Sequence, residues 1–296
     1  MRLTPPANLQ KRKLKGKLYA GVLIAATLLG IVVLVTLLVR IFVVGIGHLD
    51  WQFITSFPSR FPEQAGIWSA LMGTLWMMGF TLVFSVPLGV GAALYLEYYA
   101  PKNRWTDMVQ TNISNLAGVP SIVYGLLGLT VFVRWMSLDR SVFAGSLTMT
   151  LLVLPITIIA TNEALRATPS SLATASYALG AGKWQTIRRV ILPYAFPGIL
   201  TGVILSMSRA IGETAPLIMI GALTYIAFVP GSDGLLNAPL DPFTALPIQI
   251  FNWTSRPQAG FQEIAATGII VLLIVLLAMN GLAIFLRDRF QKKIQD

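Results

Sequence analysis

The amino-acid sequence predicts an all-α membrane protein with six transmembrane helices. Hydrophobic residues make up 55% of the 296 residues and charged residues only 11%, whereas ordinary globular domains contain about 25% charged residues. The hydrophobic residues gather in long runs, and the chain has room for about six spans of roughly 20 apolar residues each, together with their loops. Composition, run length and chain length therefore agree on a helical protein that crosses the membrane several times.

Six apolar runs have the length of helices that cross a hydrocarbon layer about 30 Å thick. The fifth run is longer than one crossing needs, and Gly212 and Pro216 near its middle favour a break there. The expected spans are 18–44, 67–96, 109–133, 142–161, 194–228 and 264–286.

The first run follows the basic segment KRKLKGK and so imitates a secretory signal peptide. It is longer than the roughly 7–15 residues of a signal-peptide core, and no convincing small-residue cleavage site follows it. We expect it to be retained as the first transmembrane helix.

Lysine and arginine are distributed unevenly between the two sides of this arrangement. With both termini in the cytoplasm, sixteen of the 22 Lys and Arg lie in cytoplasmic segments and four in external ones. The remaining two, Arg40 and Arg209, lie within spans. Because basic residues hold loops on the cytoplasmic side, this bias predicts that orientation. It also explains the net charge of +10 without a nucleic-acid partner.

Two long segments separate the spans. The external segment 229–263 is rich in Pro, Gly, Asp and Asn and is expected to be an irregular loop. The cytoplasmic segment 162–193 contains a helix-start signal at Pro169, then Ala and Leu at helical spacing, the interruption Gly180-Ala181-Gly182 and a basic end. A short helix, a turn and a second helix fit this segment.

Arg209 and Glu213 are the most informative residues, because they lie four positions apart inside the fifth apolar run. Opposite charges at this spacing share one face of a helix. Each charge costs about 2.5–3.5 kcal/mol in the bilayer interior on insertion scales, so such residues usually line a polar pathway. Small and polar residues at helical spacing extend the same face: Gly202, Ser206 and Pro216.

The chemistry of the pair indicates an oxyanion. An arginine offers paired donors and a permanent positive charge, which suit a tetrahedral anion. A carboxylate such as Glu213 repels anions but accepts a hydrogen bond from a protonated one, which favours phosphate over sulfate. Ser206 and Thr214 are further candidate hydroxyl donors. The alternatives are that Glu213 simply neutralises Arg209, or that the pair only holds helices together.

The cytoplasmic segment presents a small, apolar and weakly charged surface in a loop that faces water. Such a surface usually binds a partner, although it could also lie on the membrane or pack beneath its own bundle. The residues predicted to make this contact are Ala175, Tyr177, Ala178, Leu179 and Gly180.

The stretch TASYALGAGKWQTIRRVILP resembles the signature of ABC-importer permeases, Glu-Ala-Ala-x3-Gly-x9-Ile-x-Leu-Pro, which forms the coupling helix of that family. Four positions keep the motif residues: Ala175, Gly180, Leu192 and Pro193. Three positions differ, since the motif's Glu, second Ala and Ile are replaced by Thr174, Ser176 and Val190. Without the acidic residue, coupling would depend on shape and apolar docking.

The resemblance extends over about residues 67–286. The segments YLEYYAPKNRW, TNISNLAGVPSIVYGLLGL, NEALRATPSSLATASYALG and SRAIGETAPLI are similar to the permease subunits of phosphate-specific importers, and Gly-Glu-Thr-Ala-Pro is more typical of the A-type subunit than of its C-type partner. The resemblance implies the type I ABC importer permease fold in the bacterial inner membrane. It also implies a C-type permease, two ATPase subunits that use ATP and magnesium, and a periplasmic or extracellular phosphate-binding protein as partners.

Other chemistries are excluded or unsupported by the sequence. The chain has no cysteine and one histidine, His48, so thiol catalysis and thiolate metal sites are excluded, and neither a resident metal nor another cofactor is expected. The segment GAGKW lacks the spacing of a phosphate-binding loop, so ATP hydrolysis is assigned to a separate subunit and the chain is not expected to be an enzyme.

We therefore expect an A-type phosphate importer subunit, in which Arg209 and Glu213 hold the anion and a helix at about 170–188 couples to the ATPase. The alternatives are a permease for sulfate or molybdate, an ATPase-independent anion transporter or channel, and a membrane scaffold. The predicted parts are a basic segment (1–17), a first helix with its external loop (18–66), the permease domain (67–286) and a cytoplasmic tail (287–296).

Overall fold

The computed structural model describes residues 9–232, 234 and 236–295, and within these residues the only β-type pairing is one isolated bridge between Ser141 and Pro242. The all-α prediction is confirmed. Residues 1–8 of the predicted basic segment, and Asp296 of the predicted tail, lie outside the described residues. The helical segments are, in chain order, α1 (Leu9–Gly45), η1 (Ile46–His48), α2 (Trp51–Thr55), η2 (Pro62–Gln64), α3 (Trp68–Leu94), η3 (Tyr95–Tyr99), α4 (Arg104–Leu116), α5 (Ser121–Gly128), η4 (Leu129–Trp135), α6 (Val142–Arg166), α7 (Ser170–Ala178), α8 (Lys183–Thr186), η5 (Ile187–Ile191), α9 (Leu192–Gly212), α10 (Ala215–Ile220), α11 (Leu246–Thr254) and α12 (Ala259–Gln295).

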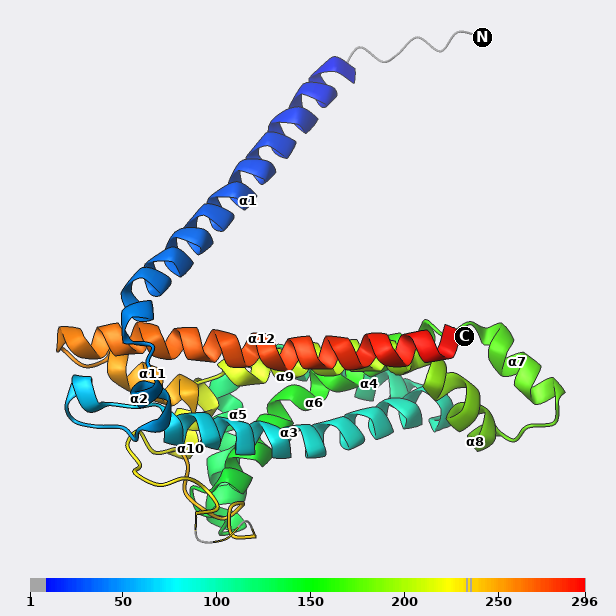
Figure 1. The fold of residues 1–296 in the computed structure, drawn as a ribbon. Coiled ribbons are helices and arrows are strands. Elements are labelled where there is room, and N and C mark those ends of the chain that lie inside the picture. Colours follow the sequence, from blue (N-terminus) through cyan, green and yellow to red (C-terminus); the bar gives the residue numbers. More distant parts are fainter. Residues whose placement is uncertain (1–8, 233, 235, 296) are drawn as a thin grey trace.

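The body of the molecule is built from α3, α6, α9 and α12 (Figure 1). Five helices of the described chain are long and apolar enough to cross a membrane, and a sixth crossing results if the bent pair of α4 with α5–η4 is counted as one span. This agrees with the six predicted spans. Helices α7 and α8 lie at the opposite end of the body from α2 and α11 (Figure 1).

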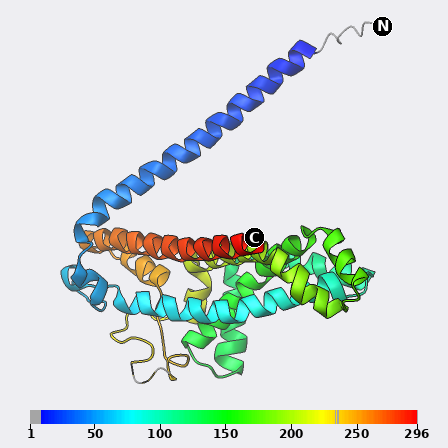
Figure 2. The ribbon, with the colours of Figure 1, turned by 45° about the vertical axis from the view of Figure 1, so that its right-hand side comes forward.

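Helix α1 projects away from this body in both views (Figures 1 and 2). Its sequence is apolar on all sides over the spanning part, and none of that part is buried against the rest of the chain. Only its last residues touch the body, where the Thr267 hydroxyl donates to the Gly45 carbonyl at 2.8 Å. A Cβ at Gly45 would lie 2.7 Å from the backbone of Ala266, so glycine permits this close crossing of α1 and α12.

Small residues and hydroxyls hold α3, α6 and α9 together. The Ser146 hydroxyl on α6 donates to the Met77 carbonyl on α3 at 3.1 Å, and Gly89 on α3 faces Thr157 on α6. Lipid tails are as apolar as leucine, so close backbone approach and interhelical hydrogen bonds have to supply the association energy. The hydrophobic core accordingly lies at these crossings.

The third predicted span is not one helix, and the expectation over 109–133 was wrong in this respect. Helices α4 and α5 meet at an angle of 101°. The bend falls at the sequence Gly118-Val119-Pro120, where proline directs the preceding residue away from the helical region and offers no N–H to continue the helix. Composition alone could not distinguish a sharp bend from a kink.

The fifth predicted span breaks where the sequence indicated. Helix α9 ends at Gly212, and α10 begins at Ala215 with Pro216 in its first turn. Gly221 then ends α10 with a φ of +83°, which glycine adopts at no steric cost. Residues 221–228, which were expected to continue this span, are not helical.

The segment 229–263 is not an irregular loop throughout, which corrects the prediction. It contains α11, whose Trp253 and Ile248 are buried. The N–H of Leu246, the first residue of α11, donates to the Thr74 hydroxyl on α3 at 2.8 Å. The Pro, Gly and Asp content that suggested a loop belongs to the residues before α11.

The segment 162–193 folds as predicted, with α7, a turn and a second helical stretch that runs through α8 and η5 into α9. Gly180 has a φ of +81° in the turn, a backbone conformation in which other residues are strained.

The close contact between α3 and α6 at Gly89 can be tested by substitution. A Cβ at Gly89 would lie 2.7 Å from the Thr157 side chain, whereas a Cβ at Gly91 would meet nothing within 4 Å. We expect Gly89→Val to destabilise the protein by about 1–3 kcal/mol through overpacking. Gly91→Val makes the same exchange in the same helix without the clash, and is the matched control. Thermal unfolding of both variants in detergent measures the difference, and equal midpoints would contradict this crossing.

Candidate functional site

Arg209 and Glu213 are brought together by the end of α9, not by one continuous helix. Arg209 lies in the last turn, and Glu213 follows the final residue with extended backbone angles, φ −78° and ψ 124°. The Arg209 Nε and the Glu213 Oε1 are 3.4 Å apart. The predicted pair is therefore present. The predicted helical stripe through Glu213 and Pro216 was wrong, because the helix stops before both residues.

The break has a local cause in the sequence. Gly212 weakens the helix, and Pro216 cannot donate the backbone hydrogen bond that a continuous helix would require from it. Broken helices are tolerated at membrane depth only where protein or a cavity covers the freed backbone groups. In transporters such breaks commonly line the substrate site. The position of the break thus marks the region around Arg209 as the candidate site.

The second broken span packs against the first. Gly125 on α5 lies so close to α10 that a Cβ there would be 2.7 Å from the Pro216 Cα. Tyr124, its neighbour, lies within electrostatic range of Arg209, and its hydroxyl donates to the Leu116 carbonyl at 2.8 Å, across the bend between α4 and α5. The candidate site therefore lies at the end of α9, beside the contact between α5 and α10, the helices that follow the two breaks.

Arg209 is only partly neutralised by its partner. Its side chain is 43% exposed and that of Glu213 20%. Within the described part of the chain, the only side-chain hydrogen bond of Arg209 is donated by its Nε to Glu213. The two terminal nitrogens of the guanidinium therefore have no protein partner there. These nitrogens form the donor pair that binds tetrahedral oxyanions in two-point fashion.

The two hydroxyl candidates differ. Ser206 is fully buried: its hydroxyl donates to the Val203 carbonyl at 2.9 Å and accepts from the Thr157 hydroxyl at 3.2 Å. The structure thus places Ser206 in the α6–α9 contact and not on an open surface, and its place in the pathway stays a prediction. Thr214 is half-buried beside Glu213 and stays a candidate.

The α7 surface is open. Leu179 is 90% exposed and Tyr177 is exposed, as are Ala175, Ala178 and Gly180. The opposite side of the helix is held in place, because Ala173 packs on the core and the Ser176 hydroxyl lies 2.9 Å from the Thr186 hydroxyl on α8. Thr174, at the motif's Glu position, is exposed, and its hydroxyl donates to the Ser170 carbonyl of its own helix.

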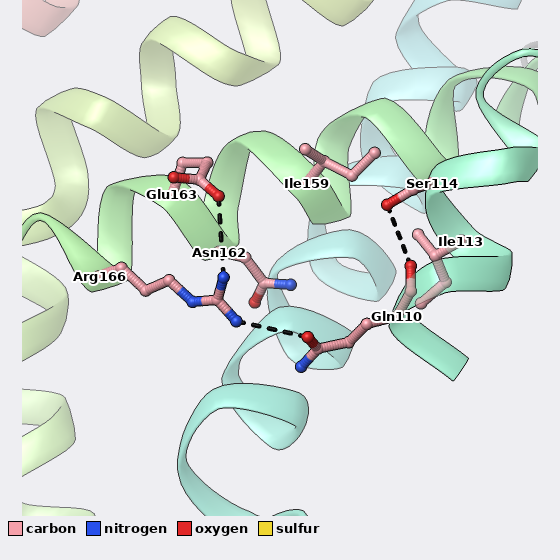
Figure 3. A pocket seen from close by; sticks show the side chains of 7 residues that line it. All are labelled: Gln110, Ile113, Ser114, Ile159, Asn162, Glu163 and Arg166. Carbon is pink, nitrogen blue, oxygen red and sulfur yellow. Dashed lines mark hydrogen bonds and ion pairs between the residues drawn. The ribbon is translucent and has the colours of Figure 1, made fainter. Parts of the chain in front are cut away.

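A third cluster, centred on Arg166 at the end of α6, was missed by the sequence analysis. The Arg166 Nε lies 2.8 Å from Glu97 Oε2 on η3. Its other nitrogens approach Gln110 on α4 at 3.4 Å and Glu163 at 3.9 Å (Figure 3). Glu97 and Arg166 are 69 positions apart, so no local spacing could have linked them.

Several apolar spans, a helix break beside a half-exposed arginine, and an exposed apolar helix beyond the spans define the class as a membrane transport subunit. The chain belongs to the family described as the binding-protein-dependent transport system inner membrane component, whose model matches residues 85–296. Membership implies a multi-pass inner-membrane protein that works with a separate solute-binding protein and a separate ATPase.

Relatives and solved structures agree with this assignment. The chain is 36% identical over 229 residues to the phosphate transport system permease protein PstA 1 of Mycobacterium tuberculosis (strain CDC 1551 / Oshkosh), covering 76% of this chain and 72% of that protein. It is 33% identical to the probable ABC transporter permease protein YqgI of Bacillus subtilis, covering 96% and 98%. A chain from the crystal structure of a bacterial alginate ABC transporter, in complex with an alginate pentasaccharide-bound periplasmic protein, matches with a TM-score of 0.62 at 18% identity, over 93% of this chain and 96% of that one. The predicted ABC importer permease fold is confirmed.

Proposed function

We propose that this chain is the A-type transmembrane subunit of an ATP-driven phosphate importer and forms half of the translocation pathway. The observation that carries the proposal is the guanidinium of Arg209, half-exposed at the break after α9, with its terminal nitrogens directed to no protein group in the described chain. The PstA relatives, which are named as phosphate permeases, support phosphate as the anion.

Glu213 accounts for the choice among oxyanions. Phosphate retains a proton near neutral pH, so it can bind the Arg209 nitrogens through its oxygens and donate its O–H to the Glu213 carboxylate. Sulfate and molybdate bind arginine equally well but have no proton to donate, and they would meet only the repulsion of the carboxylate. A permease for another oxyanion is the second candidate, and it leaves Glu213 without a use beyond neutralising Arg209.

Binding at this site is expected to be weak and transient. Phosphate has to compete with Glu213 for Arg209, and a transport site has to release its cargo after each cycle. High affinity then belongs to the phosphate-binding protein that delivers the anion. A C-type permease subunit would supply the other half of the pathway and cover the exposed side of Arg209.

In this assignment α7 faces the cytoplasm and docks on the ATPase, whose two subunits bind ATP and magnesium. The exposed apolar residues of α7 support this role, because an apolar helix surface in a hydrophilic loop favours a protein partner. The excess of basic residues in the segments around α7 and at the end of α12 supports the orientation with both termini inside. An ATPase-independent transporter would leave this surface without a function.

Removing the guanidinium tests the site. We expect Arg209→Gln to lower phosphate uptake about tenfold or more, because charge-assisted hydrogen bonds contribute about 1.5–3 kcal/mol. Glu213→Gln should narrow the preference for phosphate over sulfate and molybdate. Uptake of labelled phosphate is measured with both competitors, in cells that carry the chain with its partner subunits, at matched membrane levels.

Arg40→Gln is the control, because Arg40 is also an arginine of a predicted span but lies in α1, away from the helix breaks. Full uptake in the Arg209 variant would show that the site is wrong. Uptake that sulfate or molybdate blocks in the wild type would show that the anion is wrong.

Removing one apolar side chain tests α7. We expect Leu179→Asp to weaken ATPase binding about 30-fold or more, as loss of an interface anchor typically costs 2 kcal/mol or more. Gly180→Asp is a poorer test, because its φ of +81° would also strain the fold. Leu240→Asp, at another exposed leucine outside α7, is the control. Co-purification of the ATPase subunits gives the result, and equal binding by both variants would contradict docking at α7.

A further inference from the structure

Arg166 lies at the junction between α6 and the start of α7. It is the last residue of α6, and only residues 167–169 separate it from Ser170, the first residue of α7. The connection has no slack, because the Ala167 N–H donates to the Glu163 carbonyl at 3.0 Å and the Thr168 N–H to the Leu165 carbonyl at 3.1 Å. A displacement of α7 is therefore transmitted directly to the Arg166 backbone.

The side chain of Arg166 extends from this junction to two other elements. Its 2.8 Å ion pair with Glu97 reaches η3, and its 3.4 Å contact with Gln110 reaches α4. The Glu97 side chain is only 25% exposed, so its charge is less screened than that of a surface carboxylate. Helix α8, which follows α7, makes a second contact with η3: the Nζ of Lys183, its first residue, lies 4.8 Å from the centre of the Tyr99 ring.

Apolar side chains attach these elements to the core, through Leu96 on η3, Ile113 on α4 and Ala173 on α7, but the packing around Arg166 is incomplete. Three hollows of about 70, 260 and 400 Å³ adjoin Arg166 and share it as a lining residue. Figure 3 shows the smallest hollow, with Arg166, Asn162 and Gln110 around it. Across these spaces the polar contacts of Arg166 connect the end of α6 with η3 and α4, and the hollows leave room for relative movement.

Two buried polar atoms beside Arg166 lack partners in this arrangement. Within the described residues, Asn162 Oδ1 and Thr168 Oγ1 make no hydrogen bond, although both are shielded from the surface. Buried polar groups are usually paired, so their isolation is consistent with a second arrangement of this junction in which they find partners. η3 itself is a π-helical turn, a feature that is frequent at functional sites.

We propose that Arg166 is a positioning residue for transport: its ion pair with Glu97 joins the end of α3 to the entry of α7, so that ATP-driven movement of α7 moves the cytoplasmic ends of α3 and α4 with it. The inference rests on the proposed function, because it assigns α7 to ATPase docking. It concerns coupling and makes no claim about the substrate.

The test compares phosphate moved per ATP hydrolysed in proteoliposomes that contain the complete importer. The variants are Arg166→Gln, Glu97→Gln and the charge reversal Arg166→Glu with Glu97→Arg. We expect each single variant to lower this ratio at least about fivefold, the lower end of typical coupling between sites, while ATP hydrolysis continues. The charge reversal should restore the ratio to within about twofold, since it re-forms the pair. Arg104→Gln, an exposed basic residue at the start of α4 without an ion pair in the described chain, is the control.

A second measurement reports on the connection without reference to transport. The chain has no cysteine, so spin labels can be attached at Tyr95→Cys on η3 and Ser171→Cys on α7, both exposed positions. With the pair intact we expect one narrow distance distribution that ATP does not change. In Arg166→Gln the distribution should broaden or shift with ATP.

The outcomes separate the two proposals. If the wild type shows no ATP-dependent phosphate uptake, the proposed function fails, and the spin-label distances alone decide the role of Arg166. If the wild type transports and both single variants keep the wild-type ratio, the coupling role is overturned. It is also overturned if the charge reversal restores nothing, or if Arg166→Gln leaves the distance distribution unchanged.

Discussion

The structure depends on one constraint: inside a bilayer each backbone N–H and C=O has to find a partner within the protein. Helices α3, α6 and α12 remain continuous, although α3 contains Pro87 and α6 contains Pro155. The crossing of α3 and α6 uses glycine and hydroxyl side chains such as Gly89 and Ser146. The helices of two other spans are interrupted: α4 and α5 at Gly118-Val119-Pro120, and α9 and α10 at Gly212 to Pro216. The helices that follow the two breaks, α5 and α10, pack against each other, with Gly125 on Pro216. That mutual cover permits non-helical backbone at depth, and it places Arg209 and Glu213 beside it.

The sequence predicted those features of the fold that depend on neighbouring residues, and it missed features that depend on tertiary contacts. Apolar run length identified the spans, and Pro216 with Gly212 identified the break in α9, because both signals are carried by neighbouring residues. The 101° bend between α4 and α5 was missed: a proline in an apolar run predicts anything from a mild kink to a reversal, and tertiary contacts decide which. Helix α11 was missed because the loop-forming residues before it dominated the composition of 229–263.

The same distinction holds for the site residues. Arg209 and Glu213 were found because their charges are conspicuous in an apolar run, and their proximity was predicted correctly although the reason was not, since Glu213 is reached by a chain turn and not by a helical face. Ser206 was assigned to the pathway by helical spacing, which cannot distinguish a pathway-facing position from a helix contact. In the structure its hydroxyl accepts a hydrogen bond from Thr157 in the α6–α9 contact. Arg166 and Glu97 gave no signal, because each resembles an ordinary basic or acidic residue near the end of a span and only the fold brings them together.

The Arg209–Glu213 pair also explains how an intramembrane charge can be both tolerated and available. An isolated arginine in the bilayer costs about 2.5–3.5 kcal/mol or more, and a carboxylate close to it offsets part of this cost. The contact is long, at 3.4 Å, and uses only the Nε, so it neutralises the charge without saturating the donors. In the proposed function, an arriving anion binds the terminal nitrogens before the ion pair separates, and Glu213 returns to Arg209 as the anion leaves. A tight bidentate pair would have held the empty site shut, whereas an unpaired arginine would have bound its cargo too firmly; the loose pair suits an anion that has to pass through.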